Sequence, residues 1–399
     1  MRVVVAPDKF KGSLTAVEVA GHVRAGLRAA APAVDVVALP VADGGDGTVD
    51  VALAAGFRAV PVTASGPTGE PVRTRWARRG DVAIVEMATV CGLTRLPDGV
   101  ADPLCASSIG LGEAVGAALA AGCTRIVLAI GGSASTDGGA GMLAALGAVV
   151  VDADGRPLRL GGAALVGAAS LDLTGLDPRL ADVDIVVACD VDNPLCGPNG
   201  AAAVYGPQKG ATRADVATLD AALGHWADLV AEATGSDHRD DAGAGAAGGV
   251  SFAACAVLGA TLRPGIDIVL DLLRFDEHLA GADLVVTGEG ALDEQTLAGK
   301  APAGVAAAAR AAGVPVVAVT GHTTLSPERL AAAGFERAYA LTDLEPDVAR
   351  CIAVAGPLLE KLSRDVAADR LPPGRPRLTT APAPGPAGRQ IESSTGPNR

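Results

Sequence analysis

The sequence predicts an α/β fold: a doubly wound domain, built from both ends of the chain, is interrupted by a second α/β domain. Short valine-rich runs alternate with Ala/Leu-rich helical segments through most of the 399 residues. Continuous apolar strands separated by helices are typical of parallel sheets covered on both faces. This alternation breaks near residues 58–90 and returns at residue 282. The economical arrangement places the second domain between the second and third strands of the first, although strand order alone leaves this insertion open.

The strands and the first helix can be located from local patterns. Thr15 and Glu18 form a capping box, and the apolar residues that follow make one buried helical stripe. Residues 58–90 have extended or hairpin character and precede a helix at about 108–122. Eight strands are expected from apolar runs: Val3–Val5, Val36–Leu39, Val82–Val85, Arg125–Ala129, Val183–Ala188, Leu284–Val286, Pro315–Val319 and Arg337–Ala340.

These elements define the expected domains. Residues 1–60 and 266–369 form the discontinuous first domain, and residues 61–265 form the inserted one. Residues 370–399 hold seven of the 26 prolines and almost no large apolar residues. Such a composition cannot bury a core, so we expect a disordered tail.

Charge and composition exclude several classes of partner. The formal net charge of −13 argues against nucleic acid and anionic membranes as partners. No run of 18 apolar residues indicates a membrane span, and the N-terminal apolar run is too short for a signal peptide. The seven cysteines form no CxxC pair, as expected in a reducing compartment. We therefore expect a cytoplasmic protein.

Polar residues follow strands or bends in several glycine-containing segments, and in open α/β sheets ligands bind at the carboxyl ends of strands. In the first segment, Lys9, Lys11 and Ser13 precede a helix and can cradle an anion, or they form a solvated loop. In the second, Asp43 is followed by Gly44 and Gly45. This segment suits Mg²⁺ or a hydroxylated substrate, or it is an Asp-Gly turn.

The third segment, GGSASTDGGAG at residues 131–141, suits a phosphate loop whose backbone amides approach the ligand closely. It lacks the GxxxxGK[ST] pattern, which excludes a P-loop NTPase. A structural glycine-rich turn is the alternative. The candidate phosphate-binding residues here are Gly131, Gly132, Ser133, Ser135, Thr136 and Asp137.

Three later segments add acids and lysines. Asp190 and Asp192 would share one side of an extended strand, a metal or ribose arrangement, or they precede a turn. Lys209 can neutralise a phosphate, or it is a surface lysine. Residues 243–249 allow close backbone approach to a ligand or tight helix packing. The last segment suits metal binding or base catalysis through Glu289 and Asp293, and its Gly288 and Lys300 are candidates for binding substrate or phosphate.

In this order, the motifs resemble the bacterial type I glycerate kinase family from residue 1 to about residue 365. They are PDKFKGSL, ADGGDGT, GGSASTDGGAGML, DVDNPL with YGPQKGA, GAGAAGG and VTGEGALDEQTLAGKAP. The resemblance implies transfer of the ATP γ-phosphoryl group to D-glycerate with Mg²⁺, giving 2-phosphoglycerate in preference to the 3-phospho isomer. It also implies a flavodoxin-like first domain. Asp46, Thr136 and Ala291 depart from the Glu, Asn and Arg common in the family.

Phosphoryl transfer needs charge neutralisation, a metal, and a base or positioning group. The lysines named above are candidates for the first need. The sequence leaves open the base, the oligomeric state (homodimer or monomer) and the pathway. It also leaves open two other functions: a kinase for another hydroxy acid, and a binding regulator without turnover. The catalytic candidates are Asp293, Glu289, Asp190 and Lys9, and the metal candidates are Asp190, Asp192 and Glu289, with Asp43 and Asp46 as alternatives.

Overall fold

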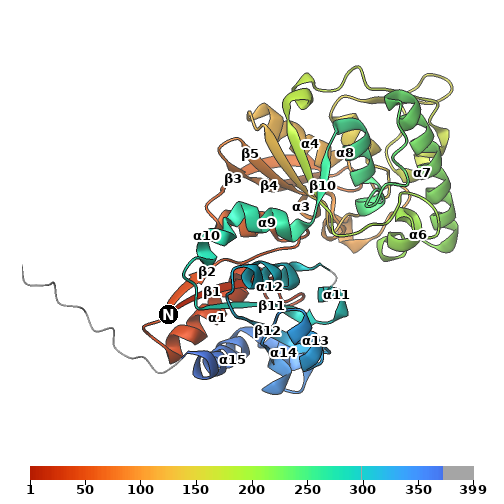
Figure 1. The fold of residues 1–399 in the computed structure, drawn as a ribbon. Helices are drawn as coiled ribbons and strands as arrows, with labels where there is room; N and C mark the ends of the chain where they lie inside the picture. Colours follow the sequence, from red (N-terminus) through yellow and green to blue (C-terminus); the bar gives the residue numbers. More distant parts are fainter. Residues whose placement is uncertain (298, 372–399) are drawn as a thin grey trace, which may run out of the picture.

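The computed structural model describes residues 1–297 and 299–371, which form two large sheets surrounded by helices (Figure 1). The first sheet consists of β1 (Arg2–Pro7), β2 (Asp35–Ala38), β11 (Leu284–Leu292), β12 (Val316–Thr323) and β13 (Arg337–Ala340). Its order is β13-β12-β11-β1-β2, and every neighbouring pair is parallel. Strands from both ends of the described chain therefore build one sheet.

The second sheet is built from the residues between β2 and β11. Its strands are β3 (Arg58–Ser65), β4 (Pro71–Arg79), β5 (Val82–Glu86), β6 (Arg125–Ala129), β9 (Asp184–Ala188) and β10 (Thr261–Arg263). Their order is β10-β9-β6-β5-β4-β3; β3, β4 and β5 pair antiparallel, and the rest pair parallel. Short hairpin connections force the antiparallel pairs. The hairpin expected at residues 58–90 and all eight expected strands are confirmed. A small third sheet pairs β7 (Val149–Val151) with β8 (Ser170–Asp172).

Helices fill the connections between these strands. None of the helices in the described ranges is long and apolar enough to cross a membrane. The α-helices are α1 (Ala16–Ala30), α2 (Thr48–Ala54), α3 (Met87–Cys91), α4 (Ile109–Ala120), α5 (Ala140–Ala145), α6 (Ala201–Tyr205), α7 (Arg213–Thr234), α8 (Val250–Leu258), α9 (Gly265–Leu273), α10 (Phe275–Leu279), α11 (Glu294–Leu297), α12 (Ala301–Ala311), α13 (Pro327–Ala332), α14 (Val348–Ala353) and α15 (Ala355–Arg370).

Helix α1 shows how the sequence pattern becomes structure. The predicted capping box is confirmed: Glu18 N donates to Thr15 Oγ1, and Thr15 N donates to Glu18 Oε2. The predicted stripe is buried, and it packs with α15 against one face of β1. The opposite face of β1 packs against α9 and α12. Alternate residues of this strand therefore enter two different cores.

A further core packs α2 and α9, which also contact the first sheet, against the second sheet. Val49 and Phe57 around α2 and Ile268 of α9 pack with Ile84 and Val186 of the second sheet. Figure 1 shows α9 between the two sheets. The residues that enter and leave the second sheet thus also hold it against the first.

Three expected boundaries are wrong. Strands β11 and β12 run to Leu292 and Thr323, and not only to Val286 and Val319, because the two strands continue to pair with each other up to Leu292 and Thr323. The tail was expected to begin at residue 370, which is too early. Arg370 ends α15 and forms an ion pair with Glu336, and Leu371 is only 7% exposed. The rest of the expected tail, residues 372–399, lies outside the described residues.

Candidate functional site

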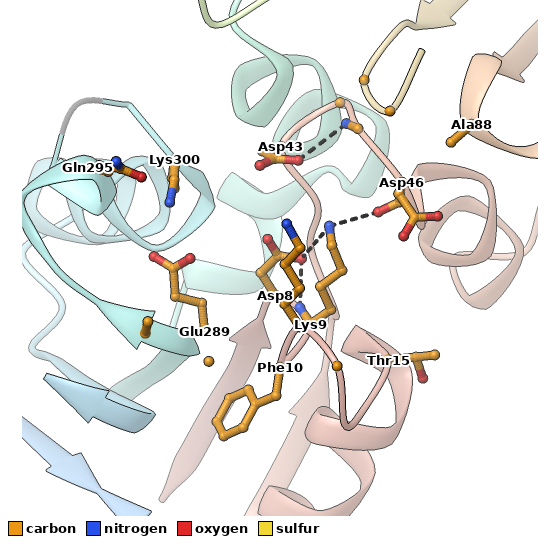
Figure 2. A pocket seen from close by; sticks show the side chains of 18 of the residues that line it. Asp8, Lys9, Phe10, Thr15, Asp43, Asp46, Ala88, Glu289, Gln295 and Lys300 are labelled. Carbon is orange, nitrogen blue, oxygen red and sulfur yellow. Dashed lines mark hydrogen bonds and ion pairs between the residues drawn. The ribbon is translucent and has the colours of Figure 1, made fainter. Parts of the chain in front are cut away.

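A cleft of about 1150 Å³ lies between the two sheets. Its lining includes the segments that follow β1, β6 and β9 and the late residues of β11. Carboxyl ends of parallel strands from both sheets therefore face the same space, the usual location of ligands in α/β proteins. Figure 2 shows the labelled side chains of Asp8, Lys9, Asp43, Glu289 and Lys300 around this space.

Most of the predicted site residues meet in this cleft, although they come from distant parts of the chain. Those that line it are Lys9, Lys11, Ser13, Asp43, Gly44, Gly45, Gly131, Gly132, Ser133, Asp190, Lys209, Glu289, Asp293 and Lys300. Those that do not line it are Ser135, Thr136, Asp137, Asp192 and Gly288.

The second half of the glycine-rich 131–141 loop lies beneath the cleft surface. Ser135, Thr136 and Asp137 are buried. The Asp137 carboxylate accepts hydrogen bonds from the backbone N and the Oγ of Ser108, at 2.8 and 2.9 Å, so it organises the start of α4. These three residues are therefore placed beneath the cleft surface, and their direct contact with a ligand stays a prediction.

Asp192 and Gly288 are also off the cleft, for separate reasons. Strand β9 ends at Ala188, so the side-to-side alternation that would align Asp192 with Asp190 does not apply, and Asp192 is exposed. Gly288 lies inside β11, where an added Cβ would come within 1.7 Å of the Val319 carbonyl oxygen. Glycine is therefore required there by strand packing.

The predicted metal set is not assembled as expected. Asp190 and Glu289 line the cleft, but Asp192 does not. Within residues 1–297 and 299–371, no group of three or more His, Cys, Asp or Glu side chains is arranged to hold a metal ion. A cation here would have to take further ligands from a substrate.

Asp8 is a site residue that the sequence reasoning missed. Its side chain is only 5% exposed, and it lines the cleft at the end of β1. Burial raises the pKa of Asp8 to about 7; Lys9 acts against this shift, while Asp43 and Glu289 add to it. Asp8 belongs to the PDKFKGSL motif and directly follows the first strand. This position was the sequence signal that could have identified it as a site residue.

Lys9 links the end of β1 to the 43–47 loop. Its Nζ donates to the backbone oxygen of Asp46 at 2.8 Å and lies 3.8 Å from Asp8 Oδ1 (Figure 2). Burial opposes the charge of this lysine, but the carboxylates of Asp8 and Asp43 outweigh it and raise the pKa of Lys9. Lys9 therefore stays a cation in the centre of the cleft.

The end of β11 contributes a second pair of opposite charges. Glu289 is buried, and its Oε1 accepts a hydrogen bond from Thr296 Oγ1 at 2.5 Å. Burial raises the pKa of Glu289, and Lys300 partly offsets the shift. Asp293 Oδ1 accepts the backbone N–H groups of Gln295 and Thr296, at 2.9 and 3.2 Å, which orders the turn that carries Lys300.

Lys209 and Asp190 lie on the side of the second sheet. Lys209 is buried, and its Nζ donates to the carbonyl oxygen of Ser135 at 2.5 Å, within the glycine-rich loop. Burial lowers the pKa of Lys209 to about 8. The Asp190 side chain keeps access to solvent, yet partial burial raises its pKa to about 6, and its Oδ1 accepts the N–H of Gly265 at 2.9 Å.

Chemically, the cleft joins lysines to several carboxylates. The charge of Asp43 adds to the rise in the pKa values of Asp8, Asp190 and Glu289, which burial mainly causes. Such a site attracts a divalent cation and can bind anionic phosphates through its lysines and glycine-loop amides. It can also accept a proton from a hydroxyl group.

Comparison with known proteins gives a consistent result. A family model described as "Glycerate kinase family" matches residues 3–370. Glycerate kinase from Bacillus subtilis (strain 168) is 44% identical over 371 residues, which cover 92% of this chain and 97% of the relative. Glycerate 2-kinase from Escherichia coli (strain K12) is 46% identical over 327 residues, covering 81% and 86%. A crystal structure assigned to a glycerate kinase 2 from Salmonella typhimurium LT2 is 44% identical, with a TM-score of 0.81, and covers 92% of this chain and 98% of that one.

Proposed function

The chain belongs to the glycerate kinase family, and from this membership we infer that it transfers the γ-phosphoryl group of ATP to a hydroxyl of D-glycerate. The predicted family resemblance is confirmed. The observation that supports the chemistry is the convergence of the family-like motifs on one cleft that is lined by both lysines and carboxylates. Phosphoryl transfer depends mainly on such positioning and charge stabilisation.

The product is expected to be 2-phosphoglycerate, since a relative that is 46% identical carries the name glycerate 2-kinase. With ATP, Mg²⁺ and D-glycerate, ³¹P NMR of the first product should identify this isomer, and an enolase-coupled assay should consume it directly. ATP consumption without glycerate is the control. Initial formation of 3-phosphoglycerate would show the regiochemistry to be wrong, and the absence of glycerate-dependent ATP consumption would refute the kinase assignment.

The site chemistry fits Mg²⁺. This ion is usually held by one or two carboxylates together with substrate phosphates and water, so it does not need a dedicated cage of protein ligands. We propose Asp190 and Asp43 as the carboxylates that would hold it. When bound, the ion would neutralise charge on the phosphate oxygens.

We propose Asp8 as the base. The hydroxyl oxygen of glycerate attacks the γ-phosphorus as the bond from this phosphorus to the bridging oxygen breaks, and the bond's electron pair leaves with ADP. The hydroxyl proton passes to the Asp8 carboxylate. Lys9, Lys209 and Lys300 neutralise phosphate charge, and Glu289 and Asp293 hold Lys300 in place. The direct metal role expected for Glu289 is thus replaced by a positioning role.

Lys11 is exposed on the cleft lining, and we propose that it binds the carboxylate of glycerate or a phosphate of ATP. Lys11→Ala should therefore raise the KM for glycerate or ATP by about 10-fold, the order expected for one charged hydrogen bond, while kcat changes little. Steady-state kinetics with each substrate varied would measure this effect. Lys361→Ala, on exposed α15 surface, is the control. A loss confined to kcat would contradict the ground-state role.

The finer description of the fold is also a proposal. The order β2-β1-β11-β12-β13 matches the 2-1-3-4-5 order of flavodoxin-like sheets. This supports a doubly wound first domain, residues 1–60 with 266–369, and an inserted domain, residues 61–265.

We also propose a cytoplasmic location, in keeping with seven free cysteines in the described residues. Monomer and homodimer both remain open.

A further inference from the structure

Glu86 lies at the carboxyl end of β5, in the second sheet, and its side chain is only 1% exposed. It does not line the cleft. Its two carboxylate oxygens accept backbone N–H groups at the start of α2: Oε1 from Gly47 at 3.2 Å and Oε2 from Val49 at 2.8 Å. Both oxygens of a buried acid therefore hold the end of the 43–47 loop and the start of α2, and the charge of Glu86 also adds to the raised pKa of Lys9.

The loop beside this attachment carries groups of the cleft. Asp43 lines the cleft, and the Asp46 carbonyl oxygen accepts the hydrogen bond from Lys9. Thr48, the first residue of α2, donates its Oγ1 hydrogen to the Gly45 carbonyl oxygen at 2.7 Å. The loop is thus a short segment whose shape determines where Asp43 and Lys9 lie.

The loop also runs between the two sheets with little free space. A Cβ on Gly44 would come within 2.4 Å of the Ala188 Cβ, and a Cβ on Gly131 within 2.6 Å of the Gly45 Cα. The loop therefore contacts the ends of β9 and β6 through backbone and small side chains. Glu86 adds the directional polar contact to this packing.

We propose that Glu86 is a positioning residue for phosphoryl transfer, which fixes the 43–47 loop so that Asp43 and Lys9 are aligned in the cleft. This inference rests on the proposed kinase function, although the structural contact itself does not. Positioning matters here because a displacement of about 1 Å in a catalytic group can cost about 10²-fold in rate.

A carboxylate suits this role because both of its oxygens face N–H donors. A glutamine would turn its NH₂ group toward one of the two backbone N–H groups, and one buried donor would lose its partner. Burial raises the pKa of Glu86 to about 7, while the N–H groups of Val49 and Gly47 act in the opposite direction. Retention of an acid at so buried a place is consistent with a specific requirement for its two acceptors.

The test is Glu86→Gln in the full-length protein. We expect kcat to fall by roughly 10- to 100-fold, with much smaller changes in the KM values for ATP and glycerate. Hydrogen exchange measured by mass spectrometry without ligands should become faster in the peptide that covers residues 43–50 and stay unchanged in core strands. Glu86→Asp, which keeps the charge but withdraws it from the donors, should show the same pattern to a smaller degree and serves if the glutamine variant does not fold.

The matched control is Glu113→Gln. The Glu113 carboxylate also accepts a backbone N–H, from Ser65 at 2.5 Å, but it joins α4 to β3 and does not line the cleft. Glu113→Gln should lower the free energy of unfolding without changing kcat. A normal kcat in Glu86→Gln, an equal loss in Glu113→Gln, or unchanged exchange in residues 43–50 would overturn the proposal. If the wild type fails to phosphorylate glycerate, the proposed function is wrong, and the exchange result still decides the loop contact.

Discussion

Asp8→Asn is expected to lower kcat by about 10²- to 10⁴-fold, the usual cost of losing a general base. The asparagine keeps the size of the side chain and can still accept the backbone N–H of Lys9, but it cannot take the hydroxyl proton. Because this loss affects the transition state, the KM values should change much less than kcat. Steady-state kinetics on folded protein, verified by circular dichroism, would measure the effect.

The pH profile gives an independent test of Asp8. The base must be ionised to accept a proton, so kcat/KM of the wild type should rise with pH up to the Asp8 pKa of about 7. It should fall again above pH 8, because Lys209, whose pKa is about 8, then loses the charge that neutralises phosphate. Burial is the main cause of the raised pKa of Asp8; Lys9 lowers this pKa, and Asp43 and Glu289 raise it further. The rise should be absent in Asp8→Asn. Asp35→Asn, at the opposite end of the same sheet, is the control. A normal kcat in Asp8→Asn would remove it from the mechanism.

Glu289→Gln and Asp293→Asn should each reduce kcat by at least about 10²-fold. The side chain of Glu289 lies near that of Lys300 (Figure 2). Asp293 accepts the backbone N–H groups of Gln295 and Thr296 and so orders the start of the segment that leads to Lys300. Loss of either acid should therefore misplace the cation that stabilises charge on the transferring phosphoryl group. Kinetics at saturating ATP and glycerate would measure the loss.

The matched control for this pair is Glu294→Gln. Glu294 lies between the two acids and Lys300 in sequence, but it is exposed, pairs with Arg329 and does not line the cleft. It should leave kcat unchanged. Near-normal kcat in both Glu289→Gln and Asp293→Asn would show that these acids do not position Lys300 for the reaction, and Asp190 would be the next acid to test.

Much of the fold and of the cleft lining could be predicted because both follow from local patterns. Apolar runs located the strands, and the rule that ligands gather at strand ends brought together Lys9, Gly131 and Glu289, which are far apart in sequence. Ser135 and Asp137 could not be separated from Ser133 by this reasoning, since only the path of the loop decides which of them faces the cleft. Glu86 ends an apolar run, and its partners are about 40 residues away, so no local pattern indicated its role.

The strand order of the first sheet also has a consequence for how the chain folds during synthesis. Strand β1 pairs with β11, which begins at Leu284, whereas the second sheet uses only strands between Arg58 and Arg263. The second sheet can therefore form during synthesis before β11, the later neighbour of β1, has been made. Closing so long a loop is slow, and until then the valine-rich β1 keeps an unpaired edge. We expect nascent chains that stop before Leu284 to aggregate or to bind chaperones.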